Sequence, residues 1–226
     1  MAHILSIDAS TTGCSVALFE NENLLASSES RTERSSAEYL TTMIDHVMEM
    51  GRLPFSELDA IVVAKGPGSY TGLRIAVSTA KGLAFSLDKP LISYNTLEGL
   101  VNQIIDFEID TNLYCPMIDA RRMEVYCAFF DKKGKQVLET TAEIVDENSF
   151  SEILDQNIVT FLGEGSHKIA GVLNHPNARY LKIPVQPSAK YTGKICYENY
   201  VNGKFESLVD FEPYYLKEYM FKTKKP

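Results

Sequence analysis

The sequence predicts an α/β protein built as two related halves, and the main evidence is an internal repeat. The stretches 4–20 (ILSIDASTTGCSVALFE) and 115–131 (CPMIDARRMEVYCAFFD) share an Ile-Asp-Ala triplet at a constant offset of 111 positions. Beyond the turn, an Ala-x-Phe triplet recurs at the same offset. Each stretch has the pattern of a strand, a polar turn and a second strand. We therefore expect two sheets whose equivalent first strands end at Asp8 and Asp119.

The remainder of the first half alternates between helical and strand patterns. After a polar-tipped hairpin (FENENLL), an amphipathic helix is expected from about 37 to 50. The run DAIVVA at 59–64 is short, apolar and rich in β-branched residues, which is typical of a buried strand. A helix should follow the next, glycine-rich loop, and then a strand at 91–94 and a helix from about Leu97.

The second half repeats this plan with shorter elements. They are a hairpin (FFDKKGKQV), a short helix near Phe150, the strand IVTFLG at 158–163, a short helix near Lys168 and a helix from about Ser188. We expect a mixed sheet in each half and a reduced second half. The predicted domains are 1–100, an α/β half that carries the interface helices, and 101–226, a smaller α/β half.

The composition is that of an ordinary globular protein of 226 residues, with 45% hydrophobic and 23% charged residues. The net charge of −8 argues against a dedicated nucleic-acid binder, because clustered Lys and Arg supply most affinity for phosphate backbones. It leaves open an action on RNA within a larger assembly. Widely spaced cysteines and a start without a secretory apolar segment predict reduced thiols and a cytoplasmic location. No apolar run approaches the ~20 residues of a membrane helix.

The glycine-rich stretch 65–74 (KGPGSYTGLR) fits neither standard phosphate-loop pattern. A Walker A loop requires Gly-Lys-Ser/Thr at its end, and the dinucleotide fingerprint requires G-x-G-x-x-G. Glycine also allows a sharp strand-to-helix turn and a close backbone approach. We interpret the stretch as a helix-entry loop. Its residues are Gly66, Pro67, Gly68, Ser69, Tyr70 and Thr71.

Four motifs, in this order, carry a resemblance to a known family. They are ILSIDAST near the start, KGPGSYTGLRIAVSTAKGLA, IDARRMEVY, and EPYYLK near the end. They closely resemble the bacterial TsaB (YeaZ) family, and the duplicated plan resembles the actin-like ATPase (ASKHA) fold of actin, sugar kinases and Hsp70. The resemblance implies a non-catalytic scaffold subunit of the complex that forms N6-threonylcarbamoyladenosine at position 37 of tRNAs. One departure is Ser35, where family members often have a histidine, which weakens any role for that position.

In the superfamily that the chain resembles, two Asp-bearing hairpin turns hold the phosphates of a nucleotide. Such loops need small residues, because backbone N–H groups must reach the phosphates. The first loop meets this need and is interpreted as a remnant nucleotide loop of Asp8, Ser10, Thr11, Thr12 and Gly13. The second, 121–124 (RRME), is bulky. We therefore expect no cofactor in the isolated chain, and ATP or ADP only at a composite site in a complex.

The rival function classes are a glycoprotease-like metallopeptidase and a weak ATPase of the same superfamily. Catalytic relatives of the family that the chain resembles bind metal through two histidines one helical turn apart plus a distant carboxylate. The histidines here are His3, His46, His167 and His175, and no pair lies three or four positions apart. No G-x-S-x-G nucleophile elbow is present. We predict no metal site, no catalytic residue and a function carried by a surface.

The two long helices of the first half are predicted to form that surface. Beside the core stripe of the first helix lies a second stripe that includes Met43, and the two stripes span roughly 200°, more than the ~100° that one sheet requires. Small residues at i, i+4 spacing in the second helix would let another helix approach closely. The predicted partner interface comprises Tyr39, Met43, His46, Met50, Gly72, Ile75, Ala76, Thr79 and Ala80.

Two such helices from each of two homologous subunits would form a four-helix contact about a pseudo-twofold axis. The resemblance implies the same arrangement: a heterodimer with a larger, metal-bearing homologue, TsaD, which transfers the threonylcarbamoyl group from its adenylate. It also implies that a small P-loop ATPase, TsaE, engages the pair, and that tRNA is contacted through the complex. Alone, the chain could form a homodimer through the same helices. The basic end (Lys222, Lys224, Lys225) is expected to be a solvated tail.

Overall fold

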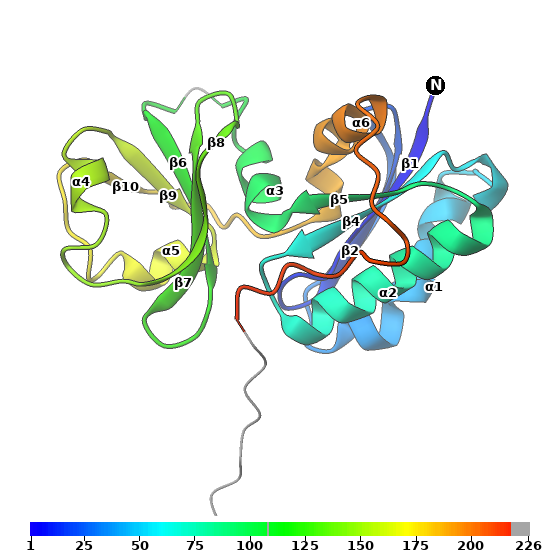
Figure 1. The fold of residues 1–226 in the computed structure, drawn as a ribbon, viewed down its shortest axis with the longest axis horizontal. Helices are drawn as coiled ribbons and strands as arrows, with labels where there is room; N and C mark the ends of the chain where they lie inside the picture. The colour runs from blue at the N-terminus through cyan, green and yellow to red at the C-terminus, as the bar shows by residue number, and fades with distance from the viewer. Residues whose placement is uncertain (108, 218–226) are drawn as a thin grey trace, which may run out of the picture.

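The computed structural model describes residues 1–107 and 109–217, which form two mixed β-sheets (Figure 1). The first sheet has the strand order β3-β2-β1-β4-β5. Its strands are β1 (His3–Asp8), β2 (Cys14–Glu20), β3 (Asn23–Ser30), β4 (Ala60–Gly66) and β5 (Leu91–Asn95). Strand β1 pairs antiparallel with β2 and parallel with β4. Asp8 therefore ends the central strand of its sheet.

The second sheet has the equivalent order β8-β7-β6-β9-β10. Its strands are β6 (Leu113–Asp119), β7 (Glu124–Asp131), β8 (Gln136–Ile144), β9 (Val159–Leu162) and β10 (Ala178–Tyr180). Asp119 ends β6 as Asp8 ends β1, so the duplicated α/β fold predicted from the repeat is confirmed. Only β10 was not expected, because three residues are too few to give a periodic pattern.

Helices cover both faces of the first sheet (Figure 1). Helices α1 (Ser35–Met50) and α2 (Tyr70–Leu87) share a hydrophobic core with Leu5 and Ile7 of β1. Since successive strand residues point to opposite faces, Ile4 belongs to the core on the other face, where α6 (Gly193–Val201) packs.

The second sheet is also covered on both faces. Helix α3 (Thr96–Asn102) packs on one face, and α4 (Ser151–Leu154) and α5 (Glu164–Ile169) share the core of the other. The second half is reduced as predicted, because α4 and α5 have only four and six residues. The boundary near residue 100 stays a prediction. It falls within α3, which follows β5 but packs on the second sheet, while α6 packs on the first.

Two 3₁₀ helices complete the described elements, η1 (Phe55–Glu57) and η2 (Ala189–Tyr191). The helix expected from about Ser188 therefore begins as η2, and its α-helical part starts at Gly193. None of the described helices is both long and apolar enough to span a bilayer. The predicted solvated tail at Lys222, Lys224 and Lys225 lies outside the described residues.

Candidate functional site

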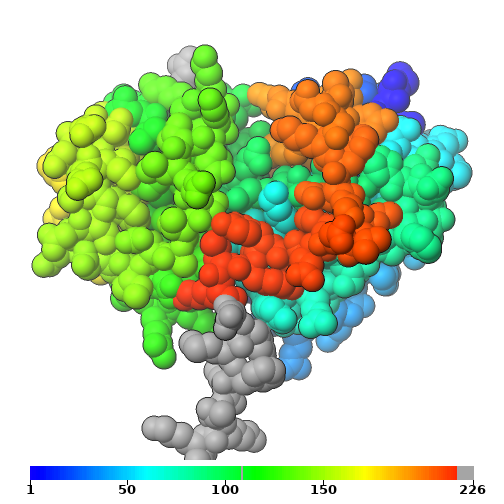
Figure 2. Space-filling model, viewed as in Figure 1, coloured from blue at the N-terminus to red at the C-terminus, as the bar shows by residue number. Residues whose placement is uncertain are grey.

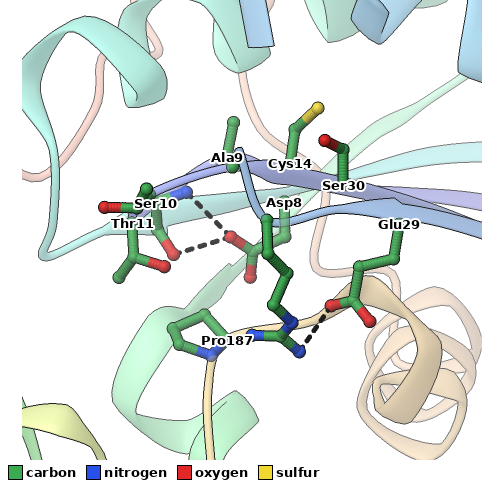
Figure 3. Close-up of a pocket in the computed structure, with 11 residues that line it drawn as sticks. Asp8, Ala9, Ser10, Thr11, Cys14, Glu29, Ser30 and Pro187 are labelled. Carbon is green, nitrogen blue, oxygen red and sulfur yellow. Dashed lines mark hydrogen bonds and ion pairs between the residues drawn. The ribbon is translucent and has the colours of Figure 1, made fainter. Parts of the chain in front are cut away.

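The carboxylate of Asp8 is buried, and it accepts hydrogen bonds from its own turn and from β5. Its Oδ1 accepts hydrogen bonds from Ser10 N at 2.8 Å and Ser10 Oγ at 2.6 Å (Figure 3), and its Oδ2 accepts one from Tyr94 OH at 2.7 Å. Burial raises the pKa of Asp8 above its usual value, and the bonds from Ser10 and Tyr94 oppose that rise. Asp8 therefore fixes the turn that begins the first loop.

Neighbouring segments lie close beside the first loop, 10–13, although Thr12 at its tip is exposed. Residues 29–31 at the end of β3 and Pro187 line a cavity of about 10 Å³ beside the loop, which is about the space of one water molecule (Figure 3). Arg31 donates hydrogen bonds to Gln186 and, at 2.7 Å, to Glu29. These contacts tie the end of β3 to the chain that enters η2.

The second loop, which joins β6 to β7, also forms hydrogen bonds and an ion pair within the chain. Asp119 Oδ1 accepts hydrogen bonds from Arg121 N and from Lys168 Nζ, both at 2.6 Å. Lys168 Nζ also donates to the backbone oxygen of Glu124 at 2.6 Å. The negative charge of Asp119 is therefore balanced by an ammonium from α5, and the two hairpin carboxylates differ: one is buried in a polar turn and the other forms an ion pair.

Within residues 1–107 and 109–217, the placement of the side chains does not support metal binding. No group of three or more His, Cys, Asp or Glu side chains in these ranges is arranged to hold an ion. The four cysteines (Cys14, Cys115, Cys127 and Cys196) are buried and unbridged. His46 is exposed on α1. The prediction that the isolated chain needs no metal is left untested.

The glycine loop allows α2 to begin directly against the first loop. A Cβ atom at Gly68 would lie 2.0 Å from the backbone oxygen of Ser10, and one at Gly72 would lie 2.0 Å from that of Ala9. Ser69 N donates to the backbone oxygen of Ser10 at 2.6 Å. The side chain of Ser69 caps α2 by accepting from Gly72 N at 3.3 Å. The glycines thus permit close backbone packing.

The same loop holds a C-terminal strap, which we define as residues 203–217. Tyr214 N donates to the backbone oxygen of Lys65 at 2.7 Å, and Gly66, at φ 112°, leaves room for this contact. The ring of Tyr215 stacks on that of Tyr70 with centroids 4.6 Å apart. Figure 2 shows the last described residues, in red, across the seam between the halves.

Contacts with α2 and with the start of β7 fix the strap to both halves. Lys81 Nζ of α2 donates to the backbone oxygen of Phe211 at 3.0 Å, and Lys217 forms an ion pair with Glu124 at the start of β7. Sequence reasoning identified EPYYLK as a motif but did not predict these contacts, because the residues that pair are far apart in the chain.

On α1, the structure corrects the predicted position of one interface residue. Tyr39, His46 and Met50 are exposed, whereas Met43 is only 8% exposed and belongs to the core. Its sulfur lies 3.6 Å from Cys14 Sγ. The two stripes together are wider than one sheet face requires because α1 also packs beside α2 and on β3. The expectation that Met43 lies away from the core was wrong.

On α2, the predicted row of small residues is used inside the chain. Gly72, Ala76 and Ala80 are buried against the first sheet and the first loop, so they do not offer a groove to another subunit. That expectation was wrong as well. The outward face of α2 carries Gly82, beside which nothing lies within 4 Å of an added Cβ, and Phe85, which is 79% exposed. Ile75 and Thr79 are half-buried.

Comparison with protein families assigns the chain. The model of the family described as TsaD, tRNA N6-adenosine threonylcarbamoyltransferase, matches residues 26–194. The chain belongs to this TsaD family. Within it, the chain is of the TsaB (YeaZ) type, as the four motifs predicted: it is 35% identical over 131 residues to the tRNA threonylcarbamoyladenosine biosynthesis protein TsaB of Bacillus subtilis.

Solved structures agree with this assignment of a TsaD-family chain. YeaZ from Pseudomonas aeruginosa superposes with a TM-score of 0.80 at 26% identity, over 96% of this chain and 100% of that one. An activator of 2-hydroxyisocaproyl-CoA dehydratase from Clostridium difficile, solved with ADPNP, shares the fold at a TM-score of 0.50 and 12% identity, over 89% of this chain and 97% of that one. The match to the Bacillus TsaB covers 58% of this chain and 56% of that protein, so the chain spans about half the length of the curated relatives it matches.

Proposed function

We propose that this chain is the non-catalytic, TsaB-type subunit of a complex that forms N6-threonylcarbamoyladenosine at position 37 of tRNAs. The observation that carries the proposal is the set of TsaB relatives, named for the biosynthesis of this modification. The geometry of the two hairpin carboxylates supports a non-catalytic role. Asp8 is held by Ser10 and Tyr94, and Asp119 is paired with Lys168, so both carboxylates already have partners within the chain.

Under this proposal, a TsaD-type homologue supplies the catalytic residues and docks on the outward faces of α1 and α2. The supporting features are exposed apolar side chains on both helices, Tyr39 at 51%, Met50 at 45% and Phe85 at 79%. Large exposed apolar side chains on adjoining helices are typical of protein interfaces. Gly82 would allow a partner helix to approach closely. The same faces would support a homodimer when the chain is alone.

Under the proposal, a nucleotide binds to other subunits or at their junction with this one. The cavity beside the first loop holds about one water molecule, so ATP or ADP would bind only where a second chain completes a site. A TsaE-type P-loop ATPase is the expected further partner. The second candidate, a metallopeptidase or an ATPase acting alone, has no described side-chain group in its favour.

The test is reconstitution of tRNA modification with purified components from one organism. A TsaD-type protein, a TsaE-type ATPase and threonylcarbamoyl-AMP are mixed with unmodified tRNA, with or without this chain, and the modified nucleoside is measured by mass spectrometry. We expect modification only when the chain is present. Equal modification without the chain would contradict the proposal. Metal-dependent peptide cleavage or sustained ATP turnover by the chain alone would favour the second candidate.

A further inference from the structure

The tip of the β6–β7 hairpin carries two arginines in an unfavourable backbone conformation. Arg121 and Arg122 have φ values of 70° and 50°, and both side chains are exposed. The left-handed region disfavours residues with a β-carbon, and turns that require it favour Gly, Asn or Asp. The hairpin closes through the bond from Ala120 N to the backbone oxygen of Glu124, at 3.1 Å. Asparagine and glycine would suit these two positions better than arginine does.

The two carboxylates of this hairpin, Asp119 and Glu124, are already paired with lysines. Asp119 pairs with Lys168, and Glu124 pairs with Lys217. Across the hairpin, Val145 N donates to the backbone oxygen of Met123, and the charged carboxylate of the next residue, Asp146, accepts hydrogen bonds within its own turn. In the described part of the chain, neither guanidinium forms an ion pair or a side-chain hydrogen bond. The tip therefore presents two unpaired guanidiniums on a chain with a net charge of −8.

We propose that the tip of Arg121 and Arg122 binds phosphodiester groups of RNA, an inference that rests on the proposed function. A guanidinium presents a planar fork of donors that matches phosphate oxygens, and two adjacent forks suit two phosphates of one strand. Strained residues persist where function requires them. Phosphate contacts of this kind position RNA without reading its sequence. The tip would thus help to hold tRNA while the partner subunit modifies it.

The test variant replaces the pair with residues that suit the backbone, Arg121→Asn together with Arg122→Gly. The variant removes both charges and relieves the strain, so the full chain should gain about 2–4 °C in Tm. The matched control, Arg121→Lys with Arg122→Lys, keeps both charges. Affinity for tRNA is measured with the complex of this chain and its TsaD-type partner over a series of salt concentrations.

Loss of two phosphate contacts should lower the slope of log K against log salt by about 1.4 to 1.8 in the Asn-Gly variant. The Lys-Lys control should keep most of that slope. An unchanged slope in the Asn-Gly variant would overturn the inference. So would loss of TsaD-type partner binding with an unchanged slope, because the tip would then recognise an acidic protein surface.

Failure of the two proposals can be told apart. If the Asn-Gly variant lowers the slope as expected but no modified nucleoside forms with the parent complex, the proposed function fails and the inference about the tip stands. If modification proceeds and the Asn-Gly variant retains the parent slope, the inference fails and the proposed function stands.

Discussion

The bond between Tyr94 and Asp8 offers a quantitative test of the buried first loop. In a Tyr94→Phe variant, Asp8 Oδ2 loses the hydroxyl that lies 2.7 Å away, in a site where Asp8 is 2% and Tyr94 1% exposed. Hydrogen bonds to charged groups contribute about 1.5–3 kcal/mol, so we expect a loss of about 2 kcal/mol in the free energy of unfolding at pH values where Asp8 is ionised. For a chain of this size, that loss lowers Tm by about 4–8 °C.

The penalty should depend on pH in a defined direction. Burial raises the folded-state pKa of Asp8 above that of the unfolded chain, so the folded state retains a proton that the unfolded state has released. The contribution of Asp8 to stability is therefore present at low pH and is lost as pH rises through the folded-state pKa. The Tyr94 bond favours the charged carboxylate, so the cost of Tyr94→Phe should be full above the folded-state pKa of Asp8 and shrink as the pH falls below it.

Thermal or urea unfolding of the parent and Tyr94→Phe across a pH series measures this difference. A double-mutant cycle with Asp8→Asn isolates the pair, because in the Asn background the tyrosine no longer faces a charge. We expect Tyr94→Phe to cost less in that background. A cost below about 0.5 kcal/mol throughout the pH series, or a cost that is equal at all pH values, would refute the assigned role of Tyr94.

Three further variants test other contacts. Met43→Glu buries a charge in the core and should lower the free energy of unfolding by several kcal/mol. The control, His46→Glu on the exposed face of the same helix, should change it by less than about 0.5 kcal/mol. Equal effects of the two substitutions would contradict the corrected position of Met43. Lys217→Glu should leave Tm nearly unchanged but speed proteolytic cleavage of the C-terminal strap. Adding Glu124→Lys to the same chain should restore the ion pair with its charges reversed, and with it the protection from cleavage. An unchanged cleavage rate in Lys217→Glu would show that the ion pair does not hold the strap. Gly72→Val places side-chain atoms against a backbone oxygen and should cost at least about 3 kcal/mol by urea unfolding, and a Tm like the parent's would contradict the close packing of α2 on the first loop.

The fold was predictable because its signals are local and repeated. The Ile-Asp-Ala triplets ended equivalent strands, and the apolar run before the glycine loop became β4. The wide apolar surface of α1 was predicted correctly, but the elements that cover it were not predicted. Met43 lies on the core side because β3 and α2 also pack on this helix. A helical pattern states which residues are apolar, and the tertiary arrangement decides what covers them.

Contacts between distant residues could not be predicted from one sequence. Arg31 bonds Gln186 although 155 positions separate them, and Lys217 reaches Glu124 across 93. The glycines gave a partial signal, because Gly68 predicted a close backbone approach without stating what approaches. The bulk of the second loop was visible in the sequence, whereas the pairing of Asp119 with Lys168 required the fold.

The most direct measurement of the central claim uses the chain without its two hairpin carboxylates. The rate of tRNA modification by the reconstituted complex is compared between the parent chain and a variant that carries both Asp8→Asn and Asp119→Asn. If the chain is a non-catalytic subunit, the folded variant should support modification at a rate within about twofold of the parent. A loss of tenfold or more, in a variant that folds and still binds the TsaD-type partner, would contradict the account and assign chemistry to these carboxylates.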